Sequence, residues 1–163
     1  MDLNSQSPYD VIEESELDYS FCTKDGIVYR AYFLSASHLH ESFTDAYSFS
    51  IEPVGEAEDT IHPMDVRISM TIAFILKDFF QKNENSMLMV CDNMDGKEEK
   101  RERLFSRWFV HHNDGSIMKF DASTSDDDYI LYVSIYIRKD NSQLHELVAA
   151  FYDLVKNDFY PID

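Results

Sequence analysis

The apolar and polar residues of this chain alternate in short runs, which is the pattern of half-buried strands. Residues 17–22 and residues 27–33 carry an aromatic or aliphatic side chain at every second position. The turn-forming Lys24-Asp25-Gly26 lies between them, so the two runs predict a hairpin. The whole pattern predicts about six strands, over residues 17–22, 27–33, 47–52, 87–91, 117–122 and 129–138.

Three other segments repeat apolar residues at the spacing of an α-helix, over about residues 63–80, 97–111 and 144–155. The first is so rich in apolar residues that we expect it to be central and largely buried, and Asn141-Ser142 is placed to cap the last. The order of elements is βββ-α-β-α-ββ-α. We therefore predict an α+β fold, with a mixed, mostly antiparallel sheet of about six strands and three helices.

The first fifteen residues differ from the rest of the chain. Residues 1–15 are polar, acidic and without a hydrophobic pattern, and we interpret them as a loose acidic lead-in. Residues 16–163 show no internal repeat and no linker, and a chain of this length can bury a core without disulfides or metals. We therefore expect a single α+β domain over residues 16–163.

The charge is strongly acidic, with 31 Asp and Glu against 14 Lys and Arg and a formal net charge of -17. Nucleic-acid binding is disfavoured, because it relies on Lys and Arg that neutralise phosphates, whereas a basic protein partner is favoured. No apolar run is long enough to span a membrane, and the N-terminus lacks the features of a signal peptide. Two cysteines do not form a disulfide framework, so we expect a cytoplasmic protein.

The basic residues concentrate in one predicted helix, since residues 97–107 hold five of the 14 Lys and Arg. Arg101 falls in phase with the apolar face of that helix, and a charged group in such a place is almost always paired. We expect Arg101 to be mostly buried and salt-bridged to Asp92 or Asp95. The alternative is a binding site built from Asp92, Asp95 and Arg101, because a guanidinium group binds carboxylates and phosphates through two parallel hydrogen bonds.

Other motifs for chemistry match only in part. The turn before the basic helix resembles a calcium-binding loop, but Cys91 stands where the first carboxylate is required. His38 and His40 alternate on an extended segment without a further ligand at suitable spacing. No serine elbow, phosphate-binding loop or dinucleotide fingerprint is present in the sequence. We therefore expect no metal, no cofactor and no hydrolase or nuclease activity.

The second face of the predicted sheet is unusually aromatic. Val28 and Tyr32 in one strand, and Tyr132 and Tyr136 in another, occupy the phase that an exposed face would fill with polar residues. Either a helix covers these side chains or they form a partly exposed tyrosine patch for a partner or for self-association. Both interpretations stay open at the level of the sequence.

Three stretches together resemble a known family. They are residues 19–29, residues 65–72 and the segment from Cys91-Asp92 through Asp95-Gly96 to Trp108-Phe109, and the third is the most specific. The chain is similar here to a family of small uncharacterised bacterial proteins, found mainly in gut anaerobes, over about residues 17–155. The resemblance implies a bacterial cytoplasmic domain and assigns no activity.

Two classes of function remain. The first is a non-enzymatic acidic protein-binding module, such as an inhibitor, an immunity protein or an antitoxin-like partner of a basic protein. It is favoured by the small size, the acidic charge and the lack of a recognisable catalytic pattern. The second is a small-ligand-binding or enzymatic domain that uses Asp92, Asp95 and Arg101 at the end of the strand Met87–Cys91.

Overall fold

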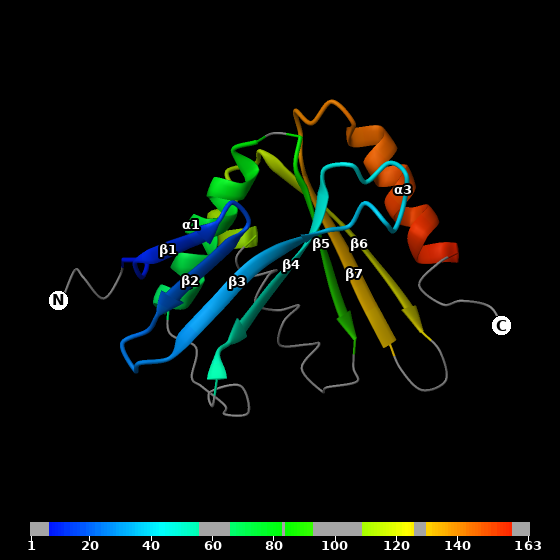
Figure 1. Ribbon diagram of the computed structural model, residues 1–163. Coiled ribbons are helices and arrows are strands. Elements are labelled where there is room, and N and C mark those ends of the chain that lie inside the picture. Colours follow the sequence, from blue (N-terminus) through cyan, green and yellow to red (C-terminus); the bar gives the residue numbers. More distant parts are fainter. Residues whose placement is uncertain (1–6, 56–65, 83, 93–108, 126–129, 158–163) are drawn as a thin grey trace. The chain divides into compact units, whose positions relative to one another are not determined.

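The computed structural model describes residues 7–55, 66–82, 84–92, 109–125 and 130–157. Their strands form one hydrogen-bonded sheet in the order β1-β2-β3-β4-β5-β7-β6. The pair β4–β5 is parallel. Antiparallel pairing joins β1 to β2, β2 to β3, β5 to β7 and β6 to β7. The strands are β1 Val11–Ser15, β2 Asp18–Cys22, β3 Val28–Ser35, β4 Ala46–Pro53, β5 Ser86–Asp92, β6 Ile117–Ser125 and β7 Ile130–Arg138. The helices are α1 Val66–Phe80, α3 Leu144–Asn157 and a helical stretch at residues 109–112 (Figure 1). The α+β fold with a mixed, mostly antiparallel sheet is confirmed.

The described strands number seven rather than about six, and the additional one is β1. It lies in the segment that we interpreted from the sequence as a loose lead-in, and that interpretation is therefore wrong for residues 11–15. β1 pairs with β2 on one side through its backbone, with Val11 opposite Phe21 and Glu13 opposite Tyr19. Four of its five side chains are exposed. A strand at a sheet edge can form with little apolar side-chain content, which is why the alternation did not reveal it.

Residues before β1 are also held in place. The backbone N–H of the buried Tyr9 donates to Thr71 Oγ1 at 2.8 Å. The Arg67 guanidinium lies 4.0 Å from the centre of the Tyr9 ring, and its Nε donates to the Ser7 carbonyl at 2.8 Å. Residues 7–10 are thus bound to α1, and the prediction of a loose segment is wrong for them too.

By their internal contacts the residues form two compact units, Met1–Leu34 with Phe49–Gln81 and Ser35–Ser48 with Lys82–Asp163. The sequence predicted one domain from residue 16, with no boundary inside it. The two units are interleaved along the chain, so no linker separates them and hydrophobic patterning gives no sign of a division. We describe each unit by itself.

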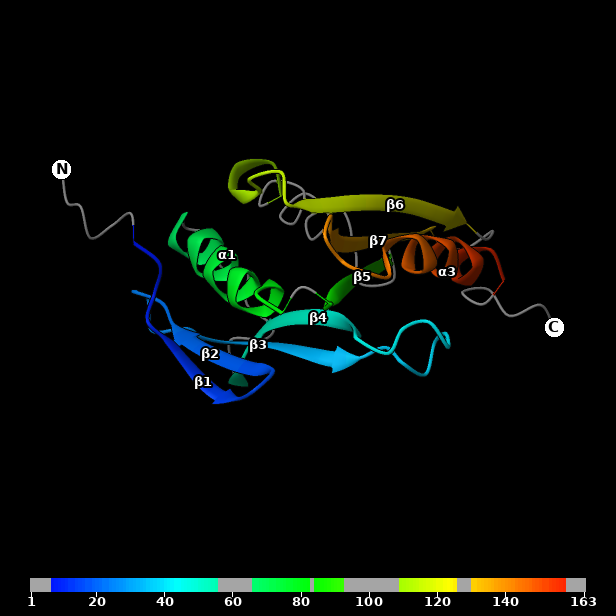
Figure 2. The same cartoon turned by 90° about the horizontal axis from the view of Figure 1, so that it is seen from above.

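In the first unit, α1 packs against one side of β1–β3 (Figure 2). The rings of Phe33 and Phe79 stack with centroids 4.1 Å apart, and Phe33 also contacts Phe49. The predicted apolar stripe of α1 is confirmed, because Ile68, Ile72, Ile75, Leu76 and Phe79 are all buried. Phe74 is 54% exposed, however, so α1 is buried on one side and open on the other.

The β2–β3 hairpin forms at the predicted turn. Gly26 has a φ of 79°, a conformation that glycine adopts without steric cost, and its N–H donates to the Thr23 carbonyl at 3.0 Å. The Thr23 N–H in turn donates to the Ile27 carbonyl at 2.9 Å. The hairpin positions Val28 directly across from Cys22.

In the second unit, α3 packs on β6 and β7 (Figures 1 and 2). The core combines apolar side chains from α3, from strands β4, β5 and β7 and from the loop before β4. Its buried members include Phe43, Leu88, Ile135, Leu147 and Phe151. β5 lies between β4 and β7, which confirms the interior strand predicted at residues 87–91.

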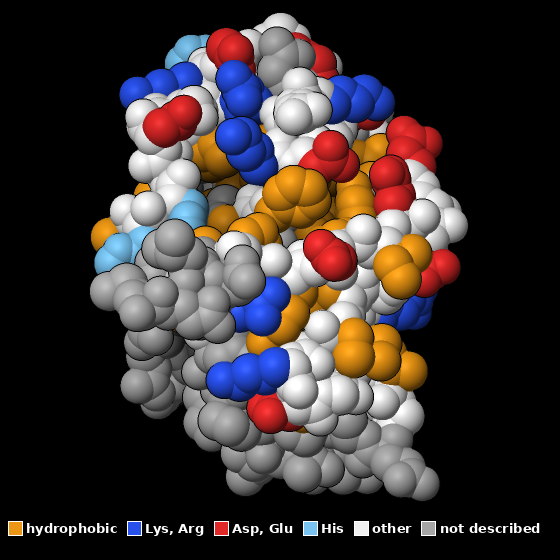
Figure 3. Space-filling model, turned by 90° about the vertical axis from the view of Figure 1, so that its left-hand side faces the viewer, with side chains coloured by type: hydrophobic (Ala, Val, Ile, Leu, Met, Phe, Trp, Pro, Cys, Tyr) orange, Lys and Arg blue, Asp and Glu red, His pale blue; other side chains and the backbone are white. Residues whose placement is uncertain are grey.

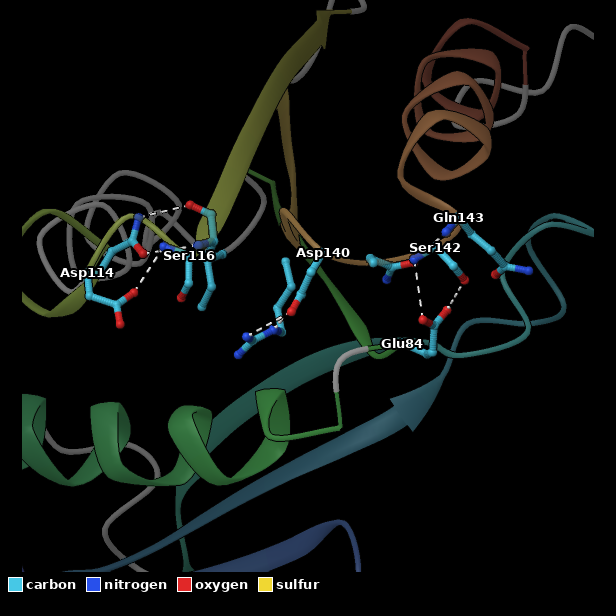
Figure 4. A network of polar contacts seen from close by, with 10 residues as sticks. Glu84, Asp114, Ser116, Asp140, Ser142 and Gln143 are labelled. Atoms are coloured by element: carbon cyan, nitrogen blue, oxygen red, sulfur yellow. Dashed lines mark hydrogen bonds and ion pairs between the residues drawn. The ribbon is translucent and has the colours of Figure 1, made fainter.

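The N-terminus of α3 is capped by side chains that Figure 4 shows. Asn141 Oδ1 accepts a hydrogen bond from the Gln143 N–H at 2.8 Å, as the sequence predicted. The Glu84 carboxylate accepts two hydrogen bonds from Ser142, at 3.3 Å from its backbone N–H and at 2.7 Å from its hydroxyl. This carboxylate therefore occupies the position in which a helix end stabilises negative charge.

Candidate protein-interaction surface

The site proposed from Asp92, Asp95 and Arg101 falls largely outside the described residues. Asp92 ends β5, where it pairs with Leu131 of β7. Asp95 and Arg101 lie among residues 93–108, which are outside the described part of the chain, and so does most of the predicted basic helix. The helical residues 109–112 agree with the predicted end of that helix. The burial and pairing of Arg101 stay a prediction.

The four residues of the predicted aromatic patch do not share one environment. Tyr136 is 1% exposed and its ring centre lies 5.8 Å from that of Phe109, so of the two interpretations that the sequence left open, burial holds for this residue. Tyr132 is half-buried on the same side of β7. Val28 is 41% exposed and Tyr32 is half-buried, and both lie on one side of β3. An interface role for these residues stays a prediction, now centred on Val28 and Tyr32.

Strands β1–β3 present one side away from α1, which we call the outer face. Residues directly opposite each other on paired strands point to the same side of a sheet. Such pairs give rows across the strands: Ile12 with Ser20 and Arg30, Cys22 with Val28, and Asp18 with Tyr32. With the next residue of the same phase on β3, the outer face comprises Ile12, Asp18, Ser20, Cys22, Val28, Arg30, Tyr32 and Leu34.

The centre of the outer face is an ion pair. Arg30 Nε donates to Asp18 Oδ1 at 3.1 Å, and Arg30 Nη2 donates to Asp18 Oδ2 at 2.8 Å. The same guanidinium lies 4.1 Å from the centre of the Tyr32 ring. The hydrogen bond from Arg30, with a smaller contribution from its positive charge, lowers the pKa of Asp18 below its ordinary value. Two side chains are thereby oriented on an otherwise exposed sheet.

Exposed apolar side chains surround this ion pair. Ile12 is 61% exposed and Leu34 is 56% exposed, and Val54, whose N–H donates to the Val28 carbonyl, is 48% exposed. The free thiol of Cys22 is exposed as well. Figure 3, which presents the left-hand side of the protein as seen in Figure 1, also shows hydrophobic side chains at the surface among charged ones. Such mixed surfaces are typical of protein contacts with polar and apolar components.

The strand at the edge, β1, is acidic. Exposed carboxylates lie within the strand, at Glu13 and Glu14, and directly before and after it, at Asp10 and Glu16. Residues 1–23 contain no Lys or Arg. The Tyr19 hydroxyl, across from Glu13, donates to Asp78 Oδ2 at 2.9 Å. Burial above all, then this hydrogen bond and the negative charges of Asp78, Glu13 and Glu16 raise the pKa of Tyr19 far above its usual range. The carboxylates of Asp78, Glu13 and Glu16 therefore place negative charge around the Tyr19 hydroxyl, beside the edge strand.

A polar cluster in the second unit was missed by sequence reasoning. Lys119 Nζ lies 3.0 Å from Asp121 Oδ1, and the Ser134 hydroxyl donates to the same oxygen at 2.5 Å. The Lys119 side chain is 12% exposed and lies 5.9 Å from the Tyr136 ring centre. The sequence pattern that could have indicated this cluster is Lys119 and Asp121 on either side of the apolar Phe120 in β6. Asp121 and Ser134 lie directly opposite each other on β6 and β7, so the cluster joins these two strands, and we assign it a structural role.

His40 is also held structurally. Its Nδ1 accepts a hydrogen bond from the Ser42 N–H at 3.0 Å, and its Nε2 lies 3.4 Å from Asp153 Oδ2. Both ring nitrogens are engaged, so neither serves as a metal ligand or a base in this arrangement. In the described ranges, no group of three His, Cys, Asp or Glu side chains is placed to hold a metal ion. The helices described there also lack the length and apolar character needed to cross a membrane.

One family model matches the chain, over residues 64–153, and its description is a family of unknown function (DUF6169). The match begins later than the expected residues 17–155, so it includes the second and third of the three stretches quoted above and leaves out residues 19–29. No curated protein and no solved structure matched the chain when it was compared with them.

Proposed function

Given that the chain belongs to the family of unknown function DUF6169, which assigns no activity, we propose that it is a non-enzymatic acidic protein-binding module whose partner is a basic protein. The observation that carries the proposal is the outer face of β1–β3. It combines exposed apolar side chains with an acidic edge, while α1 packs against the opposite side of these strands. An inhibitor, an immunity protein or an antitoxin-like protein would work in this way.

The acidic charge supports a basic partner. With a net charge of -17, the chain attracts a basic protein and repels acidic ones over several ångströms, which raises the rate of encounter. Apolar side chains such as Ile12 and Leu34 then supply contact area that charge alone does not. The proposal includes a bacterial cytoplasmic setting, and it gives self-association a minor place because copies of the chain repel one another.

The test is capture followed by reconstitution. The protein is immobilised, proteins retained from an extract of the source cells are identified, and each candidate is purified and titrated by calorimetry. We expect a saturable complex with a basic protein whose affinity falls several-fold between low and physiological salt, because salt screens exposed charges. An unrelated acidic domain of similar charge is the control, and it should bind far more weakly.

Two outcomes would contradict the proposal. A captured protein that binds the control domain equally well would show that bulk charge, not this surface, retains it. If none of the purified candidates binds at low salt, the proposal of a protein-binding function is itself contradicted.

A further inference from the structure

Among the described residues, the strand β1 leaves one edge of the sheet open. It stands first in the strand order, and no strand lies on its other side in the part of the chain that the structure describes. In an edge strand, every second residue directs its backbone N–H and C=O away from the sheet. These groups are the template onto which an extended segment of another protein can add as a further strand.

The two sides of this edge differ in chemistry. On the side of α1, Glu13 lies across from Tyr19, whose hydroxyl binds Asp78, and Glu16 acts on the same hydroxyl. On the outer face, Ile12 is 61% exposed. The side of α1 is therefore negative, whereas the outer face combines the aliphatic Ile12 with the carboxylate of Glu14, which accepts a hydrogen bond from the outer-face residue Ser20.

Charge decides between the two kinds of strand that could add here. A second copy of this chain, paired edge to edge, would bring the carboxylates of one β1 against those of the other, and like charges directly across strands are destabilising. A basic segment would meet the same carboxylates with opposite charge. The acids thus act against self-pairing and in favour of a complementary partner.

We infer that the open edge of β1 accepts an extended basic segment of the partner protein as an added strand. The inference deepens the proposed function and rests on it. Because side chains alternate along a strand, the segment should carry Lys or Arg at every second position, facing Glu13 and Asp78, and aliphatic residues between them, facing Ile12.

An irregularity in β1 limits the length of this contact. The pairing with β2 shifts between Glu13 and Ser15, and the Glu14 carboxylate accepts a hydrogen bond from the Ser20 hydroxyl at 2.9 Å. Bulges of this kind bend an edge strand and end regular pairing. The added strand is therefore short, and further contacts on the outer face must contribute to the affinity.

The probe is a short peptide of alternating lysine and valine with blocked ends, labelled for fluorescence anisotropy and titrated with the full chain. A second peptide of the same sequence carries methyl groups on alternate backbone nitrogens, which removes the hydrogen bonds of one edge and keeps the charge. We expect the first peptide to bind and the methylated peptide to bind at least several-fold more weakly, because strand addition depends on main-chain hydrogen bonds.

Protein variants locate the site. Glu13→Lys should weaken binding by about threefold to tenfold, because it turns an attraction into a repulsion. Glu52→Lys is the matched control: it makes the same change of charge at an exposed position of the same unit. Glu52 lies on β4, three strands from β1, or about 14 Å at the usual strand spacing and beyond the screening length at physiological salt. Glu13→Gln, with a smaller effect expected, replaces Glu13→Lys if the latter fails to fold.

The outcomes separate this inference from the proposed function. Equal binding of the two peptides, or equal loss in Glu13→Lys and Glu52→Lys, overturns strand addition at β1. If a basic protein partner binds and Glu13→Lys leaves its affinity unchanged, the inference fails while the protein-binding function stands. A further outcome is a dimer in sedimentation that Glu13→Pro abolishes and Glu13→Lys strengthens. Such a dimer would mean that a second copy of the chain occupies the edge, and this result would also overturn the inference.

Discussion

The side chains of Asp18 and Arg30 are oriented by each other rather than by burial. Their side chains are 25% and 46% exposed, so water screens the pair and its contribution to stability is small. The contact matters because it fixes Arg30 over Tyr32 on the outer face. Such an arrangement could not be predicted from the sequence, because it depends on which residues of two strands lie opposite each other.

Asp18→Asn tests this pair through pH. Arg30 holds the pKa of Asp18 below its ordinary value of 3.8, so the stabilisation is fully present above about pH 4 and is lost as pH falls through the lower folded-state value. We expect the variant to unfold at slightly lower urea concentration than the parent at neutral pH. The difference should shrink as pH is lowered below about 4. A difference that stays constant across this range, or that persists when Arg30→Gln is also present, would contradict the explanation.

Tyr132 and Tyr136 provide a second test, because the structure separates residues that the sequence grouped. Tyr136→Ser should lower the free energy of unfolding by about 3 kcal/mol or more, since it empties a buried site beside Phe109. Tyr132→Ser should cost only about 1 kcal/mol, because this side chain is half-buried. Urea unfolding of the two single variants measures the difference, and equal losses would argue against the burial of Tyr136.

Among the elements, the strands and helices with strong alternation or strong helical spacing were predicted well. The β2–β3 hairpin, the interior β5 and the buried stripe of α1 are all confirmed, because each buries a continuous set of apolar residues that leaves a pattern in the sequence. β1 was missed because it is stabilised through backbone pairing with β2. The exposure of Phe74 was missed because its neighbours suggested a helix buried all round.

Two phenylalanines on α1 make the helix orientation testable. Phe79 is 3% exposed and stacks on Phe33, whereas Phe74 is 54% exposed on the same helix. Phe79→Ala should lower the free energy of unfolding by about 3–5 kcal/mol. Phe74→Ala should change it by about 0.5 kcal/mol or less, because few of its contacts are lost and alanine favours helix. Chemical denaturation followed by circular dichroism measures both, and a reversed order would mean that α1 presents its other side.

For the whole molecule, charge is the property that the sequence predicts most directly. A net charge of -17 on 163 residues follows from composition alone, and so does the expectation of a basic partner. Which surface would meet such a partner could not be predicted, because the proposed surface depends on the side of β1–β3 that faces away from α1. The hypothesis of a site at Asp92, Asp95 and Arg101 came from the sequence alone. The structure does not test it, because two of its three residues lie outside those described.

The excess of acids should make stability depend on salt. Like charges repel more strongly in the compact state than in the unfolded chain, and salt screens this repulsion. We expect the melting temperature to rise between low and physiological concentrations of sodium chloride. Calorimetry at several concentrations measures it, and sucrose, which does not screen charge, is a comparison for general solute effects. A melting temperature that falls with salt would show that attractive ion pairs outweigh the repulsion.

The packing of α1 against β1–β3 also sets an order of events during synthesis. The aromatic side of the hairpin, with Phe21 and Phe33, is complete once residue 35 has been made, but Phe79 follows more than forty residues later. Until then the nascent chain carries an uncovered aromatic surface, the condition in which growing chains aggregate or recruit chaperones. Because residues 1–23 contain acids and no Lys or Arg, neighbouring chains on one messenger RNA repel each other during this interval. We therefore expect the acids of β1 to oppose aggregation before the protein is folded, and this effect would not depend on any partner.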